Sequence, residues 1–175
     1  MQVEYSLLAR TVEGEIAPFA LGQGLGMVPW SPLKNGFLSG KYRRGTQVTD
    51  SARAAFVGGP TDAEFTVIDT VAAIADELGT TSAAVSLAWL RARQGTVVPI
   101  IGARRVDHLE RNLAGLDVTL GPAQLRTLDE VSAPTLNYPA PMHGALRAML
   151  QFAGTTVDGE PSTIYPPLVQ SDTRY

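Results

Sequence analysis

The residues best suited to chemistry lie in a glycine-rich loop that follows a short apolar run. The run ends at Trp30, and residues 31–42 read Ser-Pro-Leu-Lys-Asn-Gly-Phe-Leu-Ser-Gly-Lys-Tyr. An aromatic side chain at a strand end offers a flat face for ring stacking. Glycines let backbone N–H groups approach a phosphate closely, and a lysine adds a point charge. The loop therefore indicates a ligand with a ring and phosphates; the alternative is a buried tryptophan followed by an ordinary solvated loop.

A second basic loop, Gly102-Ala103-Arg104-Arg105, comes directly after the apolar run of residues 97–101 and before a predicted helix. Helix N-termini attract anions through unsatisfied N–H groups and the helix dipole. Arginine adds a bidentate fork for phosphate. The loop is therefore a second candidate anion site. For Arg105 and Arg111 the competing interpretation, a solvent-facing charged helix start, stays open.

Two further patterns do not indicate sites. The glycines at 22, 24 and 26 precede a predicted strand and close a predicted helix, which is the reverse of a dinucleotide-binding fingerprint. His108 and His143 are the only histidines and have no second ligand at metal spacing, and the chain has no cysteine. We therefore expect no metal site.

The elements that must position these loops alternate between strands and helices. We expect strands at 2–8, 26–30 and 97–101, parallel and neighbouring in that order, with helices on their outer side. Pro99 weakens the third strand because proline cannot donate to a sheet ladder. The expected helices span 13–23, 61–79, 82–93, 106–116 and 121–131.

Several helix ends and faces can be read from the sequence. Thr61 and Glu64 have the spacing of a capping box, and Gly79 ends that helix. Its predicted inner face consists of Phe65, Ile68, Val71, Ala72, Ala75 and Leu78. The next helix has Thr81 as its N-cap and an Ala/Val/Leu/Trp content that favours burial on most sides. Tyr5 is expected in the core.

Composition sets outer limits. At 175 residues the chain is most simply one domain, but a complete eight-fold barrel typically needs about 250 residues. A net charge of −3 and a pI near 5.3 argue against a nucleic-acid surface. The absence of cysteine fits a reducing compartment, and there is no long apolar run or leader, so we expect a cytoplasmic protein without a membrane span.

Together, Gln2–Arg10, Trp30–Tyr42 and Pro99–Arg104 resemble, in order and spacing, the last three strand ends of the aldo-keto reductases, in the branch that includes the potassium-channel β subunits. The resemblance covers about residues 2–134. It implies an α/β fold: residues 1–134 as a partial (β/α)8 TIM barrel, equivalent to about the last three strands with their helices. Residues 135–175 are expected to be a proline-rich, extended C-terminal tail, with helical turns around 145–152.

The resemblance also implies the cofactor NADP(H). By this resemblance Gln2 contacts the nicotinamide carboxamide, Arg104 meets the 2′-phosphate, and His108, Arg111 and Asn112 lie along the adenosine. The family commonly has Gln where His108 stands and Glu where Arg111 stands, whereas Asn112 matches. The predicted cofactor-binding residues are Gln2, Trp30, Ser31, Leu33, Gly36, Leu38, Gly40, Lys41, Gly102, Arg104, His108 and Asn112.

No catalytic residue is expected in this chain. The family's Asp, Tyr, Lys and His tetrad belongs to the first half of its barrel, and the two lysines here, Lys34 and Lys41, both fall in the glycine-rich loop. The expected function is the NADP(H)-binding portion of an oxidoreductase that reduces aldehydes or ketones to alcohols. A small carbonyl substrate is expected only with the complete enzyme, assembled as a homo-oligomer or with a partner supplying the N-terminal half-barrel. A non-catalytic nucleotide-binding or interaction module, or a truncated gene product, remains an alternative.

Overall fold

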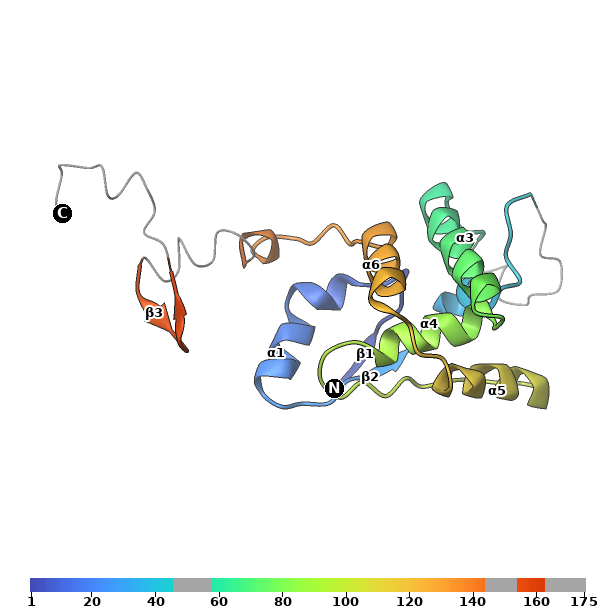
Figure 1. The fold of residues 1–175 in the computed structure, drawn as a ribbon, viewed down its shortest axis with the longest axis horizontal. Helices are drawn as coiled ribbons and strands as arrows, with labels where there is room; N and C mark the ends of the chain where they lie inside the picture. The colour runs from blue at the N-terminus through green and yellow to red at the C-terminus, as the bar shows by residue number, and fades with distance from the viewer. Residues whose placement is uncertain (46–57, 144–153, 163–175) are drawn as a thin grey trace. The chain divides into compact units, whose positions relative to one another are not determined.

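The computed structural model describes residues 1–45, 58–143 and 154–162 (Figure 1). The chain divides into two compact units, Met1–Thr135 and Leu136–Tyr175. The helical turns expected around 145–152 lie outside the described residues. No helix in the described part is long and apolar enough to cross a lipid bilayer.

Two short strands form the sheet of the first unit. β1 (Gln2–Glu4) and β2 (Val28–Trp30) run parallel, with Gln2 opposite Val28 and Glu4 opposite Trp30. The segment 97–101 lies on the other side of β2, where Val97 forms a parallel bridge with Met27. The predicted order and direction of the three extended segments are therefore confirmed, although each is shorter than predicted.

A proline explains why the third segment forms a bridge rather than a strand. Alternate residues of a parallel strand face the same neighbour. Met27 N donates to Thr96 O at 2.8 Å, and Val98 N and Ile100 N donate to Met27 O and Pro29 O at 2.9 and 2.7 Å. Pro29 thus faces the third segment without an N–H to donate, which breaks the ladder. Pro99 faces away from β2, where it removes no bond, so Pro29 rather than Pro99 limits the pairing.

Helices follow each extended segment, and their ends differ from the predictions by a few residues. The helix expected over 13–23 is a 3₁₀ turn, Thr11–Gly14, followed by α1. The helices of the first unit are α1 (Ile16–Gly22), α3 (Asp62–Glu77), α4 (Ser82–Arg91), α5 (Val106–Leu113) with a 3₁₀ turn at Ala114–Leu116, and α6 (Pro122–Val131).

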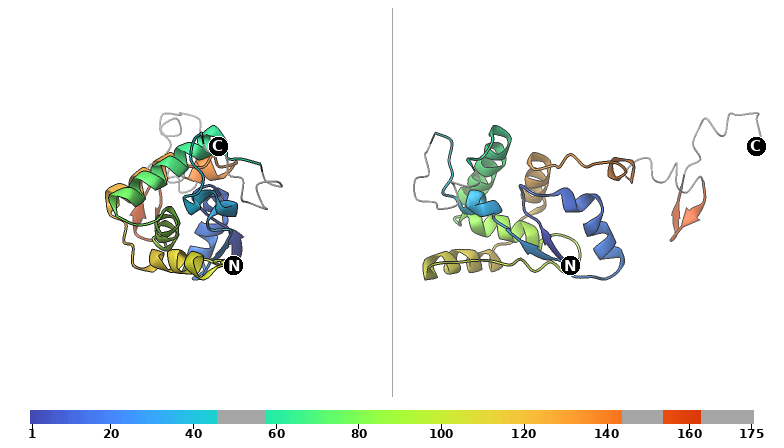
Figure 2. Two further views of the ribbon diagram at one scale, coloured as in Figure 1. Left: turned by 90° about the vertical axis from the view of Figure 1, so that its right-hand side faces the viewer. Right: turned by 180° about the vertical axis from the view of Figure 1, so that it is seen from behind.

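The core forms where α3, α4 and α6 meet beside the β1–β2 pair (Figures 1 and 2). The capping box of α3 is confirmed, because Glu64 N donates to Thr61 Oγ1 and Thr61 N to Glu64 Oε2. Its predicted inner face is wrong at Leu78, which is 38% exposed, while Phe65 is only half-buried. Val67 and Ile74 are buried instead, because α3 packs against both α4 and α6 and so buries a wider arc.

The predicted burial of α4 is confirmed. Every residue from Ser82 to Leu90 is buried, and Thr81 caps the helix by accepting a hydrogen bond from Ala84 N at 3.1 Å. The 3₁₀ turn after α5 approaches α4 so closely that a Cβ on Gly115 would lie 3.1 Å from Ala84 O and from Leu87 Cβ. A side chain at this crossing would push its neighbours apart by a few tenths of an ångström, so the close approach favours glycine.

The apolar stripe of α5 is exposed. Within the described residues, the exposed fractions are 72% for Val106, 41% for Leu109, 45% for Leu113 and 58% for Leu116. Asn112, which borders this stripe, is the buried residue of α5. α5 packs on α4, and this contact leaves the leucine stripe uncovered.

The second unit contains a 3₁₀ turn, Ala140–His143, and a small antiparallel hairpin of β3 (Thr156–Val157) and β4 (Glu160–Pro161). Asp158 and Gly159 connect the strands with φ values of 52° and 82°. An Asp-Gly pair favours such a two-residue turn. The hairpin is an element of the tail that the sequence analysis did not predict.

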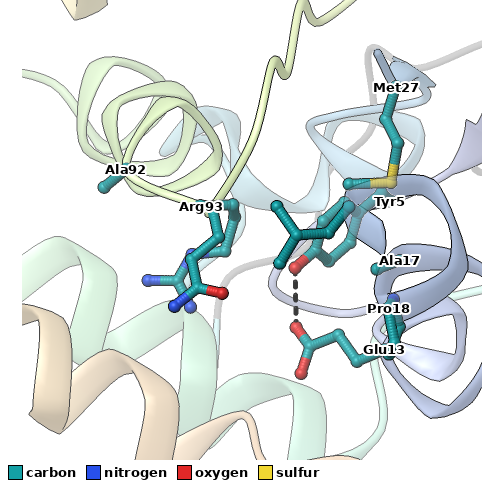
Figure 3. Close-up of a pocket in the computed structure, with 9 residues that line it drawn as sticks. Tyr5, Glu13, Ala17, Pro18, Met27, Ala92 and Arg93 are labelled. Atoms are coloured by element: carbon teal, nitrogen blue, oxygen red, sulfur yellow. Dashed lines mark hydrogen bonds between the residues drawn. The ribbon is translucent and has the colours of Figure 1, made fainter. Parts of the chain in front are cut away.

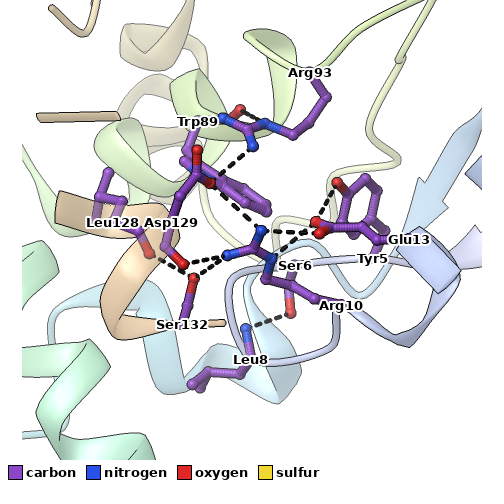
Figure 4. Close-up of polar contacts among 10 residues, drawn as sticks. All are labelled: Tyr5, Ser6, Leu8, Arg10, Glu13, Trp89, Arg93, Leu128, Asp129 and Ser132. Atoms are coloured by element: carbon purple, nitrogen blue, oxygen red, sulfur yellow. Dashed lines mark hydrogen bonds and ion pairs between the residues drawn. The ribbon is translucent and has the colours of Figure 1, made fainter. Parts of the chain in front are cut away.

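A buried guanidinium joins the first loop of the first unit to its last helix (Figure 4). Arg10 is 8% exposed; its Nε and Nη2 donate to the two Glu13 oxygens at 2.8 Å each. Its Nη1 donates to Ser132 Oγ at 2.7 Å and to Asp129 O at 2.9 Å. The Arg10 guanidinium also lies over the Trp89 ring, 5.1 Å from the ring centroid.

Trp89 links this guanidinium to a second one. The Arg93 guanidinium lies 4.3 Å from the centroid of the same ring. Trp89 Nε1 donates to Asp129 Oδ1 at 2.9 Å, and Arg93 Nη1 donates to the same oxygen at 2.8 Å.

We expect Arg10→Met to lower the free energy of unfolding by about 2–4 kcal/mol, because it leaves the partly buried Glu13 carboxylate without its cation. Arg126→Met is the matched control, since Arg126 is an exposed arginine on α6. It should change stability by less than about 0.5 kcal/mol. Urea denaturation of the three proteins measures both differences, and equal effects would contradict the role assigned to Arg10.

Candidate functional site

The two candidate loops leave the sheet side by side. Trp30 ends β2 with 44% of its surface exposed, and the loop 31–42 begins there. The hydrogen bond from Ile100 N to Pro29 O places the end of the third segment directly beside the end of β2. Carboxyl ends of neighbouring parallel strands are where α/β proteins build ligand sites. The structure therefore brings Trp30 and the Gly102–Arg105 loop to the same edge.

The loop after Trp30 holds an unusual number of left-handed residues. Ser31, Lys34 and Asn35 have φ values of 52°, 43° and 55°, and Gly36 and Gly40 have 92° and 89°. Non-glycine residues rarely adopt this region, and such outliers concentrate at functional sites. The sequence pattern did not reveal the conformation of Asn35.

Local hydrogen bonds hold this loop in shape. Ser31 Oγ accepts from Asn35 N at 3.2 Å, and Ser39 Oγ donates to Gly36 O at 2.6 Å. A Cβ on Gly40 would lie 3.3 Å from Ser82 Oγ, so the loop rests against the start of α4. Leu38 is buried in the core and Leu33 is half-buried against it. At these two positions, therefore, it is the backbone that remains for a ligand.

The two lysines of the loop differ in their surroundings. Lys34 Nζ forms an ion pair with Glu4 at 2.7 Å. Lys41 is exposed and forms no ion pair with any described residue; its Nζ lies 5.3 Å from the centre of the Tyr42 ring. Lys41 is thus the lysine whose charge is available to an anion.

The basic loop shows a similar division. Arg105 donates two hydrogen bonds to Asp107, at 2.8 and 2.7 Å, and Arg111 lies 3.7 Å from the same carboxylate. Arg104 is exposed and makes no ion pair or hydrogen bond with the described residues. This geometry favours the charged helix start for Arg105 and Arg111, and leaves Arg104 as the cation for a ligand. Around Gly102 a Cβ would meet nothing within 4 Å, so space alone does not require glycine there.

The remaining predicted residues lie on β1 and α5. Gln2 is exposed at the start of β1 and paired with Val28. His108 and Asn112 are four residues apart on α5 and so share a helix face. Asn112 is buried, and its side chain makes no hydrogen bond within the described part of the chain. No buried side-chain nitrogen or oxygen of the described residues lacks a hydrogen-bond partner, so the Asn112 amide is open to solvent.

One anchoring residue was missed by the sequence analysis. Arg44 donates to Asp69 at 2.9 Å and to Asp62 at 3.1 Å, and its guanidinium lies 5.4 Å from the centre of the Phe65 ring. It thereby ties the chain after the glycine-rich loop to α3. No local pattern could have revealed this contact, because it joins residues 18 and more positions apart.

Hydrogen bonds from Arg105 hold the pKa of the Asp107 carboxyl at about 2, below its usual 3.8. We expect Arg105→Ala to return this pKa toward 3.8, and Arg111→Ala, the more distant arginine, to change it less. Because the folded-state pKa is lowered, the pair stabilises the fold above pH 3.8, and this contribution is lost as the pH falls through about 2. Carboxyl-carbon NMR titration measures these values; equal shifts in both variants would contradict the assignment.

The chain was compared with known proteins. The model of the Aldo/keto reductase family matches residues 1–133. Similar proteins include "Uncharacterized oxidoreductase YrpG" of Bacillus subtilis (strain 168), 35% identical over 74% of this chain and 39% of that protein. They also include "Probable voltage-gated potassium channel subunit beta" of Arabidopsis thaliana, 35% identical over 74% of this chain and 42% of that protein.

A solved structure is also similar. The crystal structure of a thermostable aldo-keto reductase in complex with the inhibitor epalrestat matches with a TM-score of 0.55 and 26% identity, over 74% of this chain and 38% of that chain. This chain thus spans 39–42% of the length of the two relatives described above. The family match over residues 1–133 and the relatives at 35% identity show that this α/β chain belongs to the aldo/keto reductase family.

Proposed function

We propose that residues 1–134 are the NADP(H)-binding portion of an aldo-keto reductase, equivalent to about the last three strands of a (β/α)8 barrel with their helices. The parallel order of the three extended segments and the similarity to a solved aldo-keto reductase support this equivalence. We propose residues 135–175 as a separate C-terminal tail, and the division of the chain near residue 135 supports that boundary. The chain has no cysteine, which fits a reducing compartment, and we propose a cytoplasmic location.

One observation carries the cofactor assignment: two loops that follow neighbouring strand ends each contain a cation without a carboxylate partner in the described structure, and one of these loops begins at an exposed tryptophan. These residues are Lys41, Arg104 and Trp30. A dinucleotide with a 2′-phosphate has the matching groups, namely a ring, a pyrophosphate and a second phosphate further along. Asn112, on the helix that follows Arg104, lies in the order along the chain that the assignment requires.

The proposed contacts follow the order of the chain. Trp30 stacks against the nicotinamide ring, and Gln2 hydrogen-bonds its carboxamide. The Ser31 hydroxyl, Lys41 and the backbone around the loop glycines hold the pyrophosphate. Arg104 holds the 2′-phosphate beside Gly102, and His108 and Asn112 line the adenosine. The backbone positions meant here are Leu33, Gly36, Leu38 and Gly40.

When bound, NADPH supplies a hydride for carbonyl reduction, and this chain's residues position it. Reduction also needs a proton donor beside the carbonyl. Lys34 is paired with Glu4, and Tyr5 is buried and donates to Glu13, so neither is placed to serve. We therefore propose that the acid, and the site for a small carbonyl substrate, come from further parts of the complete enzyme.

Exposed apolar surface supports such further parts. Val98 and Ile100 on the third segment are 58% and 45% exposed, and the leucine stripe of α5 is exposed as well. Apolar surface of this extent usually marks an interface. We propose that these faces pack against the other barrel elements, in the same polypeptide, in a partner carrying the N-terminal half-barrel, or in a homo-oligomer.

The cofactor assignment predicts selective losses. Arg104→Ala should weaken the binding of NADPH by roughly 1.5–3 kcal/mol, which is the value of a charge-assisted hydrogen bond. The binding of NADH should stay nearly unchanged. The matched control Arg105→Ala should change both little, because Arg105 is hydrogen-bonded to Asp107. Trp30→Ala should weaken both cofactors similarly, because stacking does not involve the 2′-phosphate. Isothermal titration calorimetry of each variant measures these affinities, and equal loss of NADPH and NADH in Arg104→Ala would refute the phosphate role.

A second prediction concerns turnover. The chain alone should bind NADPH but not oxidise it in the presence of an aldehyde, since in the described part of the chain Lys34 is paired with Glu4 and Tyr5 is buried against Glu13. Absorbance of NADPH followed with a panel of aldehydes and ketones tests this. Sustained oxidation above the buffer rate by the purified chain would show that it contains its own catalytic acid.

A further inference from the structure

A cleft of about 460 Å³ opens between α1 and the end of α4 (Figure 3). Arg93 and Ala92 lie on one side, and Met27, Ala17 and Pro18 lie on the other. Volumes of this size suit small-molecule ligands. The walls are mixed: apolar side chains such as Leu21 and Met27 face the same space as the polar groups of Tyr5, Glu13, Arg93 and Gln94.

The cleft is separate from the proposed cofactor site. Met27 comes just before β2, whereas Trp30 ends it. Gln94 precedes the third extended segment, whereas Arg104 follows it. These cleft residues therefore lie at the opposite ends of the segments that carry the candidate cofactor loops. A ligand here would not compete with a dinucleotide bound at the strand ends.

The Glu13 carboxylate, which itself lines the cleft, is already hydrogen-bonded. Both Glu13 oxygens accept from Arg10, and Oε1 also accepts from the Tyr5 hydroxyl at 2.7 Å. Burial and the adjacent Glu13 carboxylate raise the pKa of Tyr5, so this hydroxyl stays protonated as a donor. A cationic ligand would therefore find no vacant acceptor with negative charge at Glu13.

Two hydrogen-bond donors of the cleft residues, in contrast, have no partner among the described residues. Arg93 is 17% exposed; its Nη1 donates to Asp129 at 2.8 Å and its Nε to Trp89 O at 3.3 Å. Its Nη2 makes no hydrogen bond with the described residues, and neither does the exposed side-chain amide of Gln94. A guanidinium edge beside an amide matches the two oxygens of a carboxylate. The Glu13 and Asp129 carboxylates close to this point disfavour a doubly charged anion such as phosphate.

We propose that this cleft binds a small monocarboxylate with an apolar body. The carboxylate accepts from Arg93 Nη2 and the Gln94 amide, while the body packs against Met27 and Leu21. Aromatic and branched aliphatic acids have this chemistry. This site is independent of the proposed cofactor function, since it shares no residue with it.

The test uses benzoate as the probe, followed by ¹H–¹⁵N NMR titration of the whole chain. We expect saturable shifts with an apparent Kd on the order of 1 mM, as befits a ligand with so few atoms. The shifted signals should include the Gln94 side-chain amide and the Trp89 indole, which lies beside Arg93. Benzamide, the neutral isostere, should bind at least about tenfold more weakly, because it lacks the charge that strengthens the hydrogen bonds.

Two tryptophan substitutions locate the site. Leu21→Trp fills the cleft from a half-exposed position and should weaken benzoate at least about tenfold. Leu25→Trp is the matched control, since Leu25 is similarly exposed but does not line the cleft, and it should bind as the parent chain does. Gln94→Leu should weaken benzoate without unfolding the chain, because Gln94 makes no hydrogen bond to the described residues. Absence of saturable shifts, equal binding of benzoate and benzamide, or equal binding by the two tryptophan variants would overturn the proposal.

Discussion

The fold of the first unit depends on the buried Arg10 guanidinium. This one group bonds to Glu13 in its own loop and to Ser132 and Asp129 at the end of α6. It therefore closes a contact of more than 100 residues along the chain, around the fully buried Trp89 of α4. Because the short β1–β2 pair provides few backbone bonds, side-chain contacts of this kind hold the helices over the sheet. The loops at the strand ends can then be strained, since the elements that carry them are fixed elsewhere.

The two ends of the sheet differ in whether their charged side chains are paired. At the carboxyl ends lie exposed cations and a cluster of left-handed residues, which suit a ligand. At the end of α4 lies the Arg10–Trp89–Arg93 group, in which most polar atoms are paired (Figure 4). The small cleft borders this group at Arg93. The first of these carries the proposed cofactor site, and the second carries the proposed carboxylate site. The cleft stands on the geometry of this chain.

Local patterns predicted a large share of this structure. The capping box at Thr61, the buried α4 and the parallel order of three extended segments all follow from short-range periodicity and turn chemistry. What could not be predicted depends on contacts between distant residues. α3 packs against both α4 and α6, so Ile74 is buried outside the predicted face, whereas Leu78 comes just after the last residue of α3 and is exposed. The broken ladder at Pro29 required knowing which neighbour that residue faces.

The site shows the same limit. The sequence analysis assigned Trp30 and Lys41 to the end of one extended segment and its loop, and Arg104 to the loop after another. The structure brings the two loops to the same edge of the sheet. The choice among the four basic residues Lys34, Lys41, Arg104 and Arg105 was beyond the sequence, because it depends on which carboxylates lie nearby. Glu4 forms an ion pair with Lys34, and Asp107 forms one with Arg105. Whether Gln2, Gly102 and His108 contact a cofactor stays a prediction.

Pro29 has a further consequence for how tightly a ligand is held. Since it donates no hydrogen bond to the third segment, the stretch ending at Arg104 is attached to β2 by fewer bonds than an ordinary ladder provides. Its local opening free energy is therefore lower than that of the core helices. In the proposed cofactor site, a phosphate bound by Arg104 would order this stretch, and the lost conformational entropy would offset part of the binding free energy. The missing bond thus favours rapid release of the bound group over long residence.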